Sequence, residues 1–196
     1  MTLLDDISNA IKQIDESVQI SADRIFYVNK SNLKAVLSEL KQSWRFTMLT
    51  DLFGADFPDR EKRFEVVYNL LSFKHNLRII IKIEISDKED ACSITDIFSV
   101  ANWYEREVFD MFGINFSHHP QLERILTDYG FEGHPLRKDF PLSGYKQVRY
   151  DKDLEQVIYE PVDLEQNFRN FEFSSQWQGP NYILPGDEKA SKSSKQ

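Results

Sequence analysis

The sequence predicts an α+β domain in which helices pack on an antiparallel sheet of about four strands, followed by a long extended C-terminal arm. Apolar residues recur at helical spacing in three segments and alternate with polar residues in several strand-length segments. Regular periodicity then fades after Gly113. The links between the strands are short, which favours antiparallel pairing, because a parallel crossover needs a dozen or more residues.

Three amphipathic helices are predicted. The first two are indicated by apolar residues three and four apart, namely Leu4, Ile7, Ile11 and Ile14, then Leu33, Val36, Leu37 and Leu40. Ser31 precedes the second helix and is the expected N-cap, because its hydroxyl can accept a free N–H of the first turn. The helical period returns over residues 100–112, and Gly113 follows where a left-handed residue commonly ends a helix.

Four segments have the pattern of strands. Residues 25–28 are short and apolar, and after the second helix Trp44, Phe46, Met48 and Leu52 alternate with polar residues. Residues 64–73 and 77–85 also alternate, with Phe64, Val66, Tyr68 and Leu70 on one face of the first of them. The short link at 74–76 predicts that these two strands form an antiparallel hairpin.

Three regions are expected along the chain: a core domain at 1–144, an extended partner-binding arm at 145–185 and a disordered tail at 186–196. Between residues 151 and 172 seven acidic residues stand against two basic ones, a net charge of −5. The arm also carries scattered aromatic residues, which fit a segment laid across another protein. The tail has almost no apolar residue, so it cannot bury enough surface to fold.

Composition excludes several functional classes. The 24 Lys and Arg against 32 Asp and Glu give a net charge of −8, which argues against a general nucleic-acid binder. Cys92 is the only cysteine, so a disulfide framework, a thiolate iron–sulfur cluster and a cysteine-based zinc site are excluded. No apolar run reaches the length of a membrane span, and the acidic start does not match a signal or transit peptide. We therefore expect the protein to act in the reducing compartment where it is made.

The third predicted helix holds the densest group of chemically useful side chains. At about 100° per residue, Glu107 falls inside the apolar arc that runs from Trp103 to Phe112. A carboxylate that faces the core needs a cation or several hydrogen-bond donors. Glu107 is therefore predicted to form a buried structural ion pair, for which Arg124 and Arg137 are the candidate partners.

A functional alternative makes Glu105, Glu107 and Asp110 catalytic or metal-binding carboxylates. Such a site needs two groups that converge on one point. Glu105 and Glu107 instead lie about 200° apart around the helix. Asp110 falls outside the apolar arc and is expected to pair with Arg106 on the solvent side.

No catalytic, metal-binding or cofactor-binding residue is predicted elsewhere. His118, His119 and His134 lack the i, i+4 or His-x-His spacing that places two imidazoles on one face. The seven glycines form neither a GxGxxG pattern nor a P-loop. A metal site that uses the histidines remains the alternative.

The segment 133–142 is predicted to be a restricted, charged strip, because two prolines bracket it. In an extended backbone Arg137 and Asp139 face one side and Lys138 the other. Such a strip suits docking, since arginine can clamp a carboxylate with two hydrogen bonds. An ordinary loop folded back on its own domain is the equal alternative. The candidate partner-interface residues are Arg137, Lys138, Asp139, Phe140, Phe168, Phe171, Phe173 and Trp177.

Four stretches of the sequence carry a family resemblance. They read RFEVVYNLLS at 63–72, WYEREVFDMFGI at 103–114, RILTDYGFEG at 124–133 and HPLRKDFP at 134–141. These motifs resemble those of the family of the C subunit of respiratory complex I. The likeness extends over roughly residues 46–173.

The resemblance implies a cofactor-free structural subunit in the peripheral arm of a proton-translocating NADH:quinone oxidoreductase. FMN and the iron–sulfur clusters would be held by partner subunits. The implied partners are the hydrogenase-like subunit that shapes the quinone pocket and the subunit with the terminal iron–sulfur cluster. The implied location is peripheral, on the cytoplasmic side of a bacterial inner membrane or the matrix side of the mitochondrial one, with only indirect membrane contact.

Two alternatives remain open at this stage. The chain could be the equivalent subunit of a related membrane-bound hydrogenase complex. It could also be a stand-alone metallo-hydrolase that uses the carboxylates and histidines described above.

Overall fold

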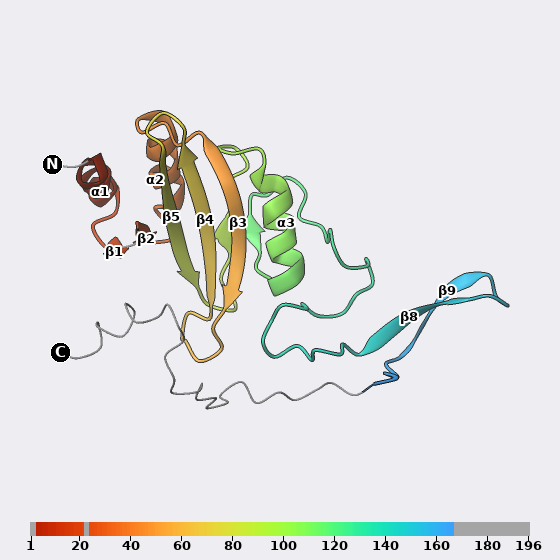
Figure 1. Ribbon diagram of the computed structural model, residues 1–196. Coiled ribbons are helices and arrows are strands. Elements are labelled where there is room, and N and C mark those ends of the chain that lie inside the picture. Colours follow the sequence, from red (N-terminus) through yellow and green to blue (C-terminus); the bar gives the residue numbers. More distant parts are fainter. Residues whose placement is uncertain (1–2, 22–23, 167–196) are drawn as a thin grey trace, which may run out of the picture. The chain divides into compact units, whose positions relative to one another are not determined.

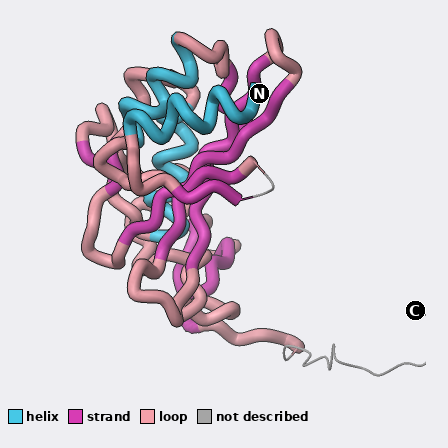
Figure 2. Tube along the Cα trace, turned by 90° about the vertical axis from the view of Figure 1, so that its left-hand side faces the viewer, coloured by secondary structure: helices cyan, strands magenta, loops and turns pink. Residues whose placement is uncertain are grey.

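A computed structural model describes residues 3–21 and 24–166 of the chain. It is an α+β fold whose five-stranded sheet has the strand order β1-β2-β5-β4-β3 (Figure 1). The helices lie on one side of this sheet, as the view in Figure 2 shows. The predicted α+β class, with helices packed on a mostly antiparallel sheet, is confirmed.

Three helices form where the apolar spacing predicts them. They are α1 (Leu3–Ile14), α2 (Leu33–Gln42) and α3 (Ala101–Phe112). Gly113 ends α3 in the left-handed region, with φ of 74°, as expected. The N-cap of α2 is Asn32 and not Ser31, whose hydroxyl instead donates to the Asn29 side chain.

The large sheet is antiparallel except at one pair of strands. The long strands β3 (Met48–Asp56), β4 (Phe64–Ser72) and β5 (Leu77–Ile85) form an antiparallel meander. Strand β2 (Ile25–Tyr27) runs parallel to β5, and β1 (Gln19–Ser21) pairs with β2. The sequence pattern missed β1, because its three residues are all exposed and show no alternation of buried and exposed positions.

The core lies between the sheet and the helices. Every second residue of β4 and β5 is buried on this side, which includes the predicted row Phe64, Val66, Tyr68 and Leu70. The buried faces of α1 and α2 supply Ile7, Ile11, Leu33, Val36, Leu37 and Leu40. Helix α3 lies against β3, where the Phe112 ring covers Gly54.

Two small, two-stranded sheets form outside the five-stranded sheet. Strands β6 (Ala91–Cys92) and β7 (Phe116–Ser117) pair in parallel. Strands β8 (Lys146–Asp151) and β9 (Gln156–Pro161) form an antiparallel hairpin. This hairpin occupies the first part of the predicted arm, immediately after the expected boundary at 144/145.

The chain divides into two compact units, Met1–Val162 and Asp163–Gln196. All the helices and strands named above belong to the first unit. Within residues 3–21 and 24–166, no helix combines the length and the apolar character that a membrane span requires. The expected tail at 186–196 lies outside the described residues.

The contact between α3 and β3 gives a prediction about Gly54. A Cβ at this position would lie 2.8 Å from Cδ2 of Phe112, which is closer than real Cβ atoms approach. Replacing Gly54 with Ala should therefore lower the free energy of unfolding by about 1–3 kcal/mol, measured by denaturant titration. The matched control is Gly130→Ala, since no heavy atom lies within 4 Å of the added carbon. Equal stability of the two variants would contradict the proposed packing.

Candidate functional site: the loop after helix α3

The buried carboxylate of Asp110 organises the loop that follows α3. One oxygen accepts the backbone N–H groups of Ile125, Leu126 and Thr127 at 2.7–3.0 Å. The other accepts Arg124 Nη1 at 2.7 Å and Thr127 Oγ1 at 2.5 Å. Burial by itself would raise the pKa of Asp110, but the donors from Thr127, Leu126 and Arg124 outweigh it and hold the pKa well below its usual range.

The same loop supplies partners for the open end of α3. The last carbonyls of a helix have no partner inside the helix. Here His134 Nδ1 donates to the Asp110 carbonyl at 3.0 Å, and the N–H of Leu136 donates to the Met111 carbonyl at 3.0 Å. Arg137 Nε donates to the Phe112 carbonyl at 2.6 Å. A segment more than twenty residues away in the sequence therefore caps the helix.

Gly113 is required by this arrangement as well as by its left-handed backbone. A Cβ at Gly113 would lie 2.5 Å from Nε2 of His134 and 3.0 Å from Nη2 of Arg137. Burial lowers the pKa of His134, which favours a neutral ring. Because a carbonyl only accepts, the proton of that neutral ring is on Nδ1.

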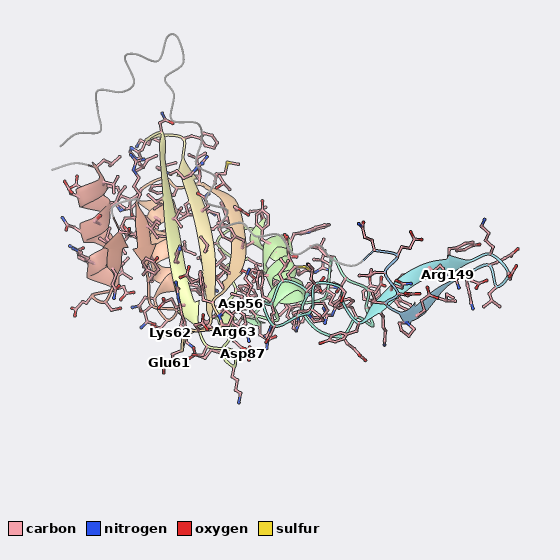
Figure 3. The ribbon with its side chains drawn as sticks, turned by 60° about the horizontal axis from the view of Figure 1, so that its bottom comes forward. Asp56, Glu61, Lys62, Arg63, Asp87 and Arg149 are labelled. Atoms are coloured by element: carbon pink, nitrogen blue, oxygen red, sulfur yellow. The ribbon has the colours of Figure 1, made fainter. Side chains whose placement is uncertain are left out.

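A second ion-pair network joins the loop to the far end of the sheet, where Asp56, Arg63 and Asp87 lie (Figure 3). Arg63 donates to both oxygens of Asp56, at 2.7 and 2.8 Å, and its Nη1 reaches Asp139 at 3.0 Å. The backbone N–H of Lys138 also donates to Asp56, at 2.7 Å. Arg137 pairs with Asp87 at 2.9 Å. These contacts hold the predicted strip against its own domain.

Glu105 is a second fully buried carboxyl group on α3. Its Oε1 accepts the N–H of Ile94 at 2.7 Å, while Oε2 has no hydrogen-bond partner within the described part of the chain. His119 Nε2 lies 3.9 Å from Oε2 and bonds instead to the Asn102 carbonyl at 3.1 Å. Burial raises the pKa of Glu105 to about 7, against the opposing effect of the Ile94 N–H.

The prediction that Glu107 forms the buried ion pair with Arg124 is wrong. Glu107 is exposed, and Arg124 pairs with Asp110. The inward face of α3 is rotated from the predicted arc, since Trp103 is 67% exposed while Glu105 and Asp110 are buried. The predicted arc assumed that the inward face of the helix is the most apolar one. That assumption fails for α3, because two of its carboxyl groups are buried in the core.

The predicted pair between Arg106 and Asp110 is also wrong. Arg106 donates to the carbonyls of Glu123 and Arg124, at 3.0 and 3.1 Å, and so fastens the beginning of the loop to α3. The sequence contains one signal for the pairing of Arg124 with Asp110. Arg124 and Thr127 both carry side-chain hydrogen-bond donors and lie close together in the loop that must fold back from Gly113, so a single carboxylate can accept from both.

The predicted partner-interface residues have different surroundings. Arg137 pairs with Asp87 and Asp139 with Arg63 within the domain, although the Asp139 side chain is still 61% exposed, so the place of this pair in a partner interface stays a prediction. Lys138 is exposed, and Phe140 is half-buried against Phe131 and Tyr145. Phe168, Phe171, Phe173 and Trp177 lie outside the described residues.

The surface of the loop and hairpin is rich in exposed apolar side chains. On the hairpin, Val148 is opposite Tyr159 and Tyr150 is opposite Val157, so all four residues share one face. Each of them is 55–59% exposed. The opposite face pairs Gln147 with Glu160 and Asp151 with Gln156.

A hollow of about 560 Å³ adjoins the apolar face of the hairpin. The Tyr159 hydroxyl donates to Asp128 at 2.5 Å and so ties the hairpin to the loop at this point. The apolar residues that line the hollow are Leu126, Phe131, Phe140, Tyr145, Val148 and Tyr159. The described residues contain no group of three or more His, Cys, Asp or Glu side chains placed to hold a metal ion.

Comparison with known proteins decides the family. A family profile described as the 30 kDa subunit of respiratory-chain NADH dehydrogenase matches residues 26–146. The chain belongs to this family. The resemblance to the C subunit of complex I is thereby confirmed, and the matched region includes both buried carboxylates of α3 and the loop that Asp110 holds.

Similar proteins extend the match beyond the family profile. The C subunit of NADH-quinone oxidoreductase from Rickettsia felis is 60% identical over 84% of this chain and 81% of its own length. The same subunit from Rickettsia typhi is 54% identical over 97% of this chain and 98% of its own length. A chain in the structure of an archaeal membrane-bound sulfane sulfur reductase is 28% identical, with a TM-score of 0.61 over 70% of this chain and 85% of that one.

Asp110 gives the second prediction. In Asp110→Asn the amide cannot accept all the donors that converge on the carboxylate, and Arg124 loses its counter-charge. The free energy of unfolding should fall by about 3 kcal/mol in denaturant titration, and the loop should become sensitive to protease. The matched control Glu107→Gln should change stability by less than about 0.5 kcal/mol, because its side chain is exposed. A larger loss for Glu107→Gln would instead make Glu107 the carboxylate that holds the loop.

Glu105 gives a pH-dependent prediction. Its folded-state pKa of about 7 lies above the ordinary value of 4.5, so between these pH values the folded state binds more protons than the unfolded state. The contribution of Glu105 to stability is complete below pH 4.5, is lost progressively up to pH 7 and is constant above it. The loss should total about 3 kcal/mol.

The measurement compares wild type with Glu105→Gln, which keeps the shape of the side chain but cannot titrate. His134, whose pKa is lowered, acts in the opposite direction below its ordinary value of 6.5, so only the difference between the two proteins is informative. That difference should change between pH 4.5 and 7 and be flat above pH 7. A difference that does not depend on pH would show that Glu105 is not held in this way.

Proposed function

We propose that this chain is a non-catalytic structural subunit of the peripheral arm of proton-translocating NADH:quinone oxidoreductase. Its role is to dock onto the hydrogenase-like subunit that shapes the quinone pocket and onto the subunit with the terminal iron–sulfur cluster. It binds no cofactor itself, and FMN and the iron–sulfur clusters belong to partner subunits. Its attachment to the cytoplasmic side of the bacterial inner membrane is indirect, through the complex.

The observation that carries this proposal is the exposed apolar face of the β8–β9 hairpin. A two-stranded hairpin is marginally stable alone in water. This one buries neither of its faces, yet it directs Val148, Tyr150, Val157 and Tyr159 to the same side. An exposed apolar face of this kind, with polar residues around it, is typical of a protein interface.

The chemistry of the loop supports a structural role. The Asp110 carboxylate accepts donors on both oxygens, and Arg63 and Arg137 are paired within the domain, so these groups hold the backbone in place. The loop therefore loses little conformational freedom when a partner binds. Arg137, Lys138, Asp139 and Phe140 extend the proposed interface, and Phe168, Phe171, Phe173 and Trp177 are proposed to continue it.

The alternative of a membrane-bound hydrogenase subunit is less well supported. Relatives named as the C subunit of NADH-quinone oxidoreductase share 54–60% identity with this chain, and the archaeal chain at 28% identity comes from a complex named as a sulfane sulfur reductase, not as a hydrogenase. A stand-alone hydrolase would need carboxylates that converge. The two buried carboxyl groups of α3 instead bind different segments, at Ile94 and at 124–127.

The test places charge on the apolar face. The double variant Tyr150→Lys/Val157→Glu places opposite charges on a cross-strand pair, and it should keep the thermal stability of the isolated chain, because both side chains are exposed. Its recovery with the complex, purified by an affinity tag on the hydrogenase-like subunit, should fall about tenfold. The control Arg149→Gln changes the opposite face and should be recovered like wild type. Undiminished recovery of the double variant would contradict docking through this face.

A further inference from the structure

At the end of the sheet opposite the ion-pair network, three cations have no acidic partner among residues 3–21 and 24–166. The turn between β4 and β5 lies there, beside the start of β3 (Figure 1). Arg45, Lys74 and Arg78 are all exposed at this end. None of the three forms a salt bridge with any described residue, in contrast to Arg63, Arg124 and Arg137.

Strand register and a hydrogen bond bring these residues together. Met48 pairs with Leu71, and Leu71 pairs with Arg78, so one row crosses three strands. Lys74 lies in the turn that follows Ser72, whose hydroxyl donates to the Trp44 carbonyl at 3.4 Å. That bond places the residue after Trp44, which is Arg45, next to the end of β4.

The local sequence leaves this end basic in an acidic protein. Neither residues 40–50 nor residues 70–83 contain an Asp or Glu, although the whole chain has a net charge of −8. Like charges held close together repel one another, so the cluster stabilises nothing by itself.

The backbone at Arg45 indicates that its side chain is needed. Arg45 has a φ of 56°, in the left-handed region that favours glycine. An arginine there costs backbone strain that a glycine would avoid. Arg45 also lines a hollow of about 430 Å³ beside Lys41 and Asp96, and the Asp96 carboxylate in it is paired with Lys34.

An exposed aromatic residue lies next to the cations. Phe73 is 70% exposed at the start of the β4–β5 turn, immediately before Lys74. Met48, in the row that it forms with Leu71 and Arg78, is 42% exposed. Apolar groups bordered by unpaired cations match a protein segment that carries both carboxylates and an apolar side chain.

We propose that this basic end is a second interaction surface, which binds an acidic segment of a partner protein. The carboxylates of that segment pair with Arg45, Lys74 and Arg78, and its apolar side chain packs on Phe73. The inference rests on the proposed function in one respect, since the partner is expected among the proteins that co-purify with the chain. It depends on residues that are distinct from those of the hairpin.

A discrete acidic segment fits better than an anionic membrane. Stable electrostatic attachment to a lipid surface takes a cluster of about four to eight Lys and Arg residues. Three cations on a chain of net charge −8 do not meet that requirement, because the remaining surface is repelled. Close pairing with a few carboxylates is much less affected by distant charges.

The first test is zero-length carbodiimide cross-linking of the purified wild-type complex, followed by mass spectrometry. This reagent joins a lysine amine to a carboxylate in direct contact with it. Lys74 should be joined to an Asp or Glu of another protein, while Lys12, an exposed lysine on α1, should not. Cross-links from Lys74 only to acids of this chain would overturn the proposal.

The second test uses charge-matched variants in cells that assemble the complex. Lys74→Glu/Arg78→Glu should lower recovery of the chain with the complex about tenfold, whereas Lys12→Glu/Lys88→Glu should not. Arg45→Gly removes one of the three cations, so it should lower recovery. Because glycine also relieves the strained backbone, the melting temperature should not fall. Recovery of all these variants at the wild-type level would overturn the proposal.

Two further outcomes separate this proposal from its neighbours. If the isolated wild-type chain bound vesicles of phosphatidylglycerol and phosphatidylcholine, and Lys74→Glu/Arg78→Glu abolished that binding, the ligand would be a membrane and the proposal would be wrong. If only the hairpin variants reduced recovery, the proposed function would stand and this inference would fail. Absence of wild-type chain from the complex would overturn both.

Discussion

The carboxylate of Asp110 is the contact on which the loop region depends. It takes the N–H groups of three successive residues and pairs with Arg124, so a single side chain sets the backbone path of 124–127. That path returns the chain to the end of α3, where His134 and Arg137 reach the helix carbonyls. Without this charge the backbone of 124–127 would lose most of the contacts that set its path, because this part of the loop contains no helix or strand.

In the loop, charged side chains are buried, whereas in the hairpin that follows it apolar side chains are exposed. Buried charges hold the loop to the helix and the sheet, whereas apolar side chains of the hairpin point into solvent. This reverses the usual order of a globular surface, in which apolar groups are mostly covered. Such a surface is consistent with a protein that completes its burial only when neighbouring proteins are present.

Much of the core could be predicted from sequence, because alternation in β4 and β5 and helical spacing in α1 and α2 follow directly from which residues are buried. Helix α3 could not be oriented in this way. Glu105 and Asp110 face inward only because Ile94 and the 124–127 backbone meet them there, and a periodic pattern contains no information about those distant partners. The same limit applies to Arg137 and Asp139, whose partners are Asp87 and Arg63, both distant in the sequence.

The capping of α3 by a distant segment also sets an order of events during synthesis. The carbonyls of Asp110, Met111 and Phe112 receive their donors from residues 134–137. While the ribosome still holds those residues, the last turn of the helix has only water as its partner. Completion of α3 therefore waits for a stretch of chain made later, and until that stretch emerges the domain exposes the site at which its loop will close.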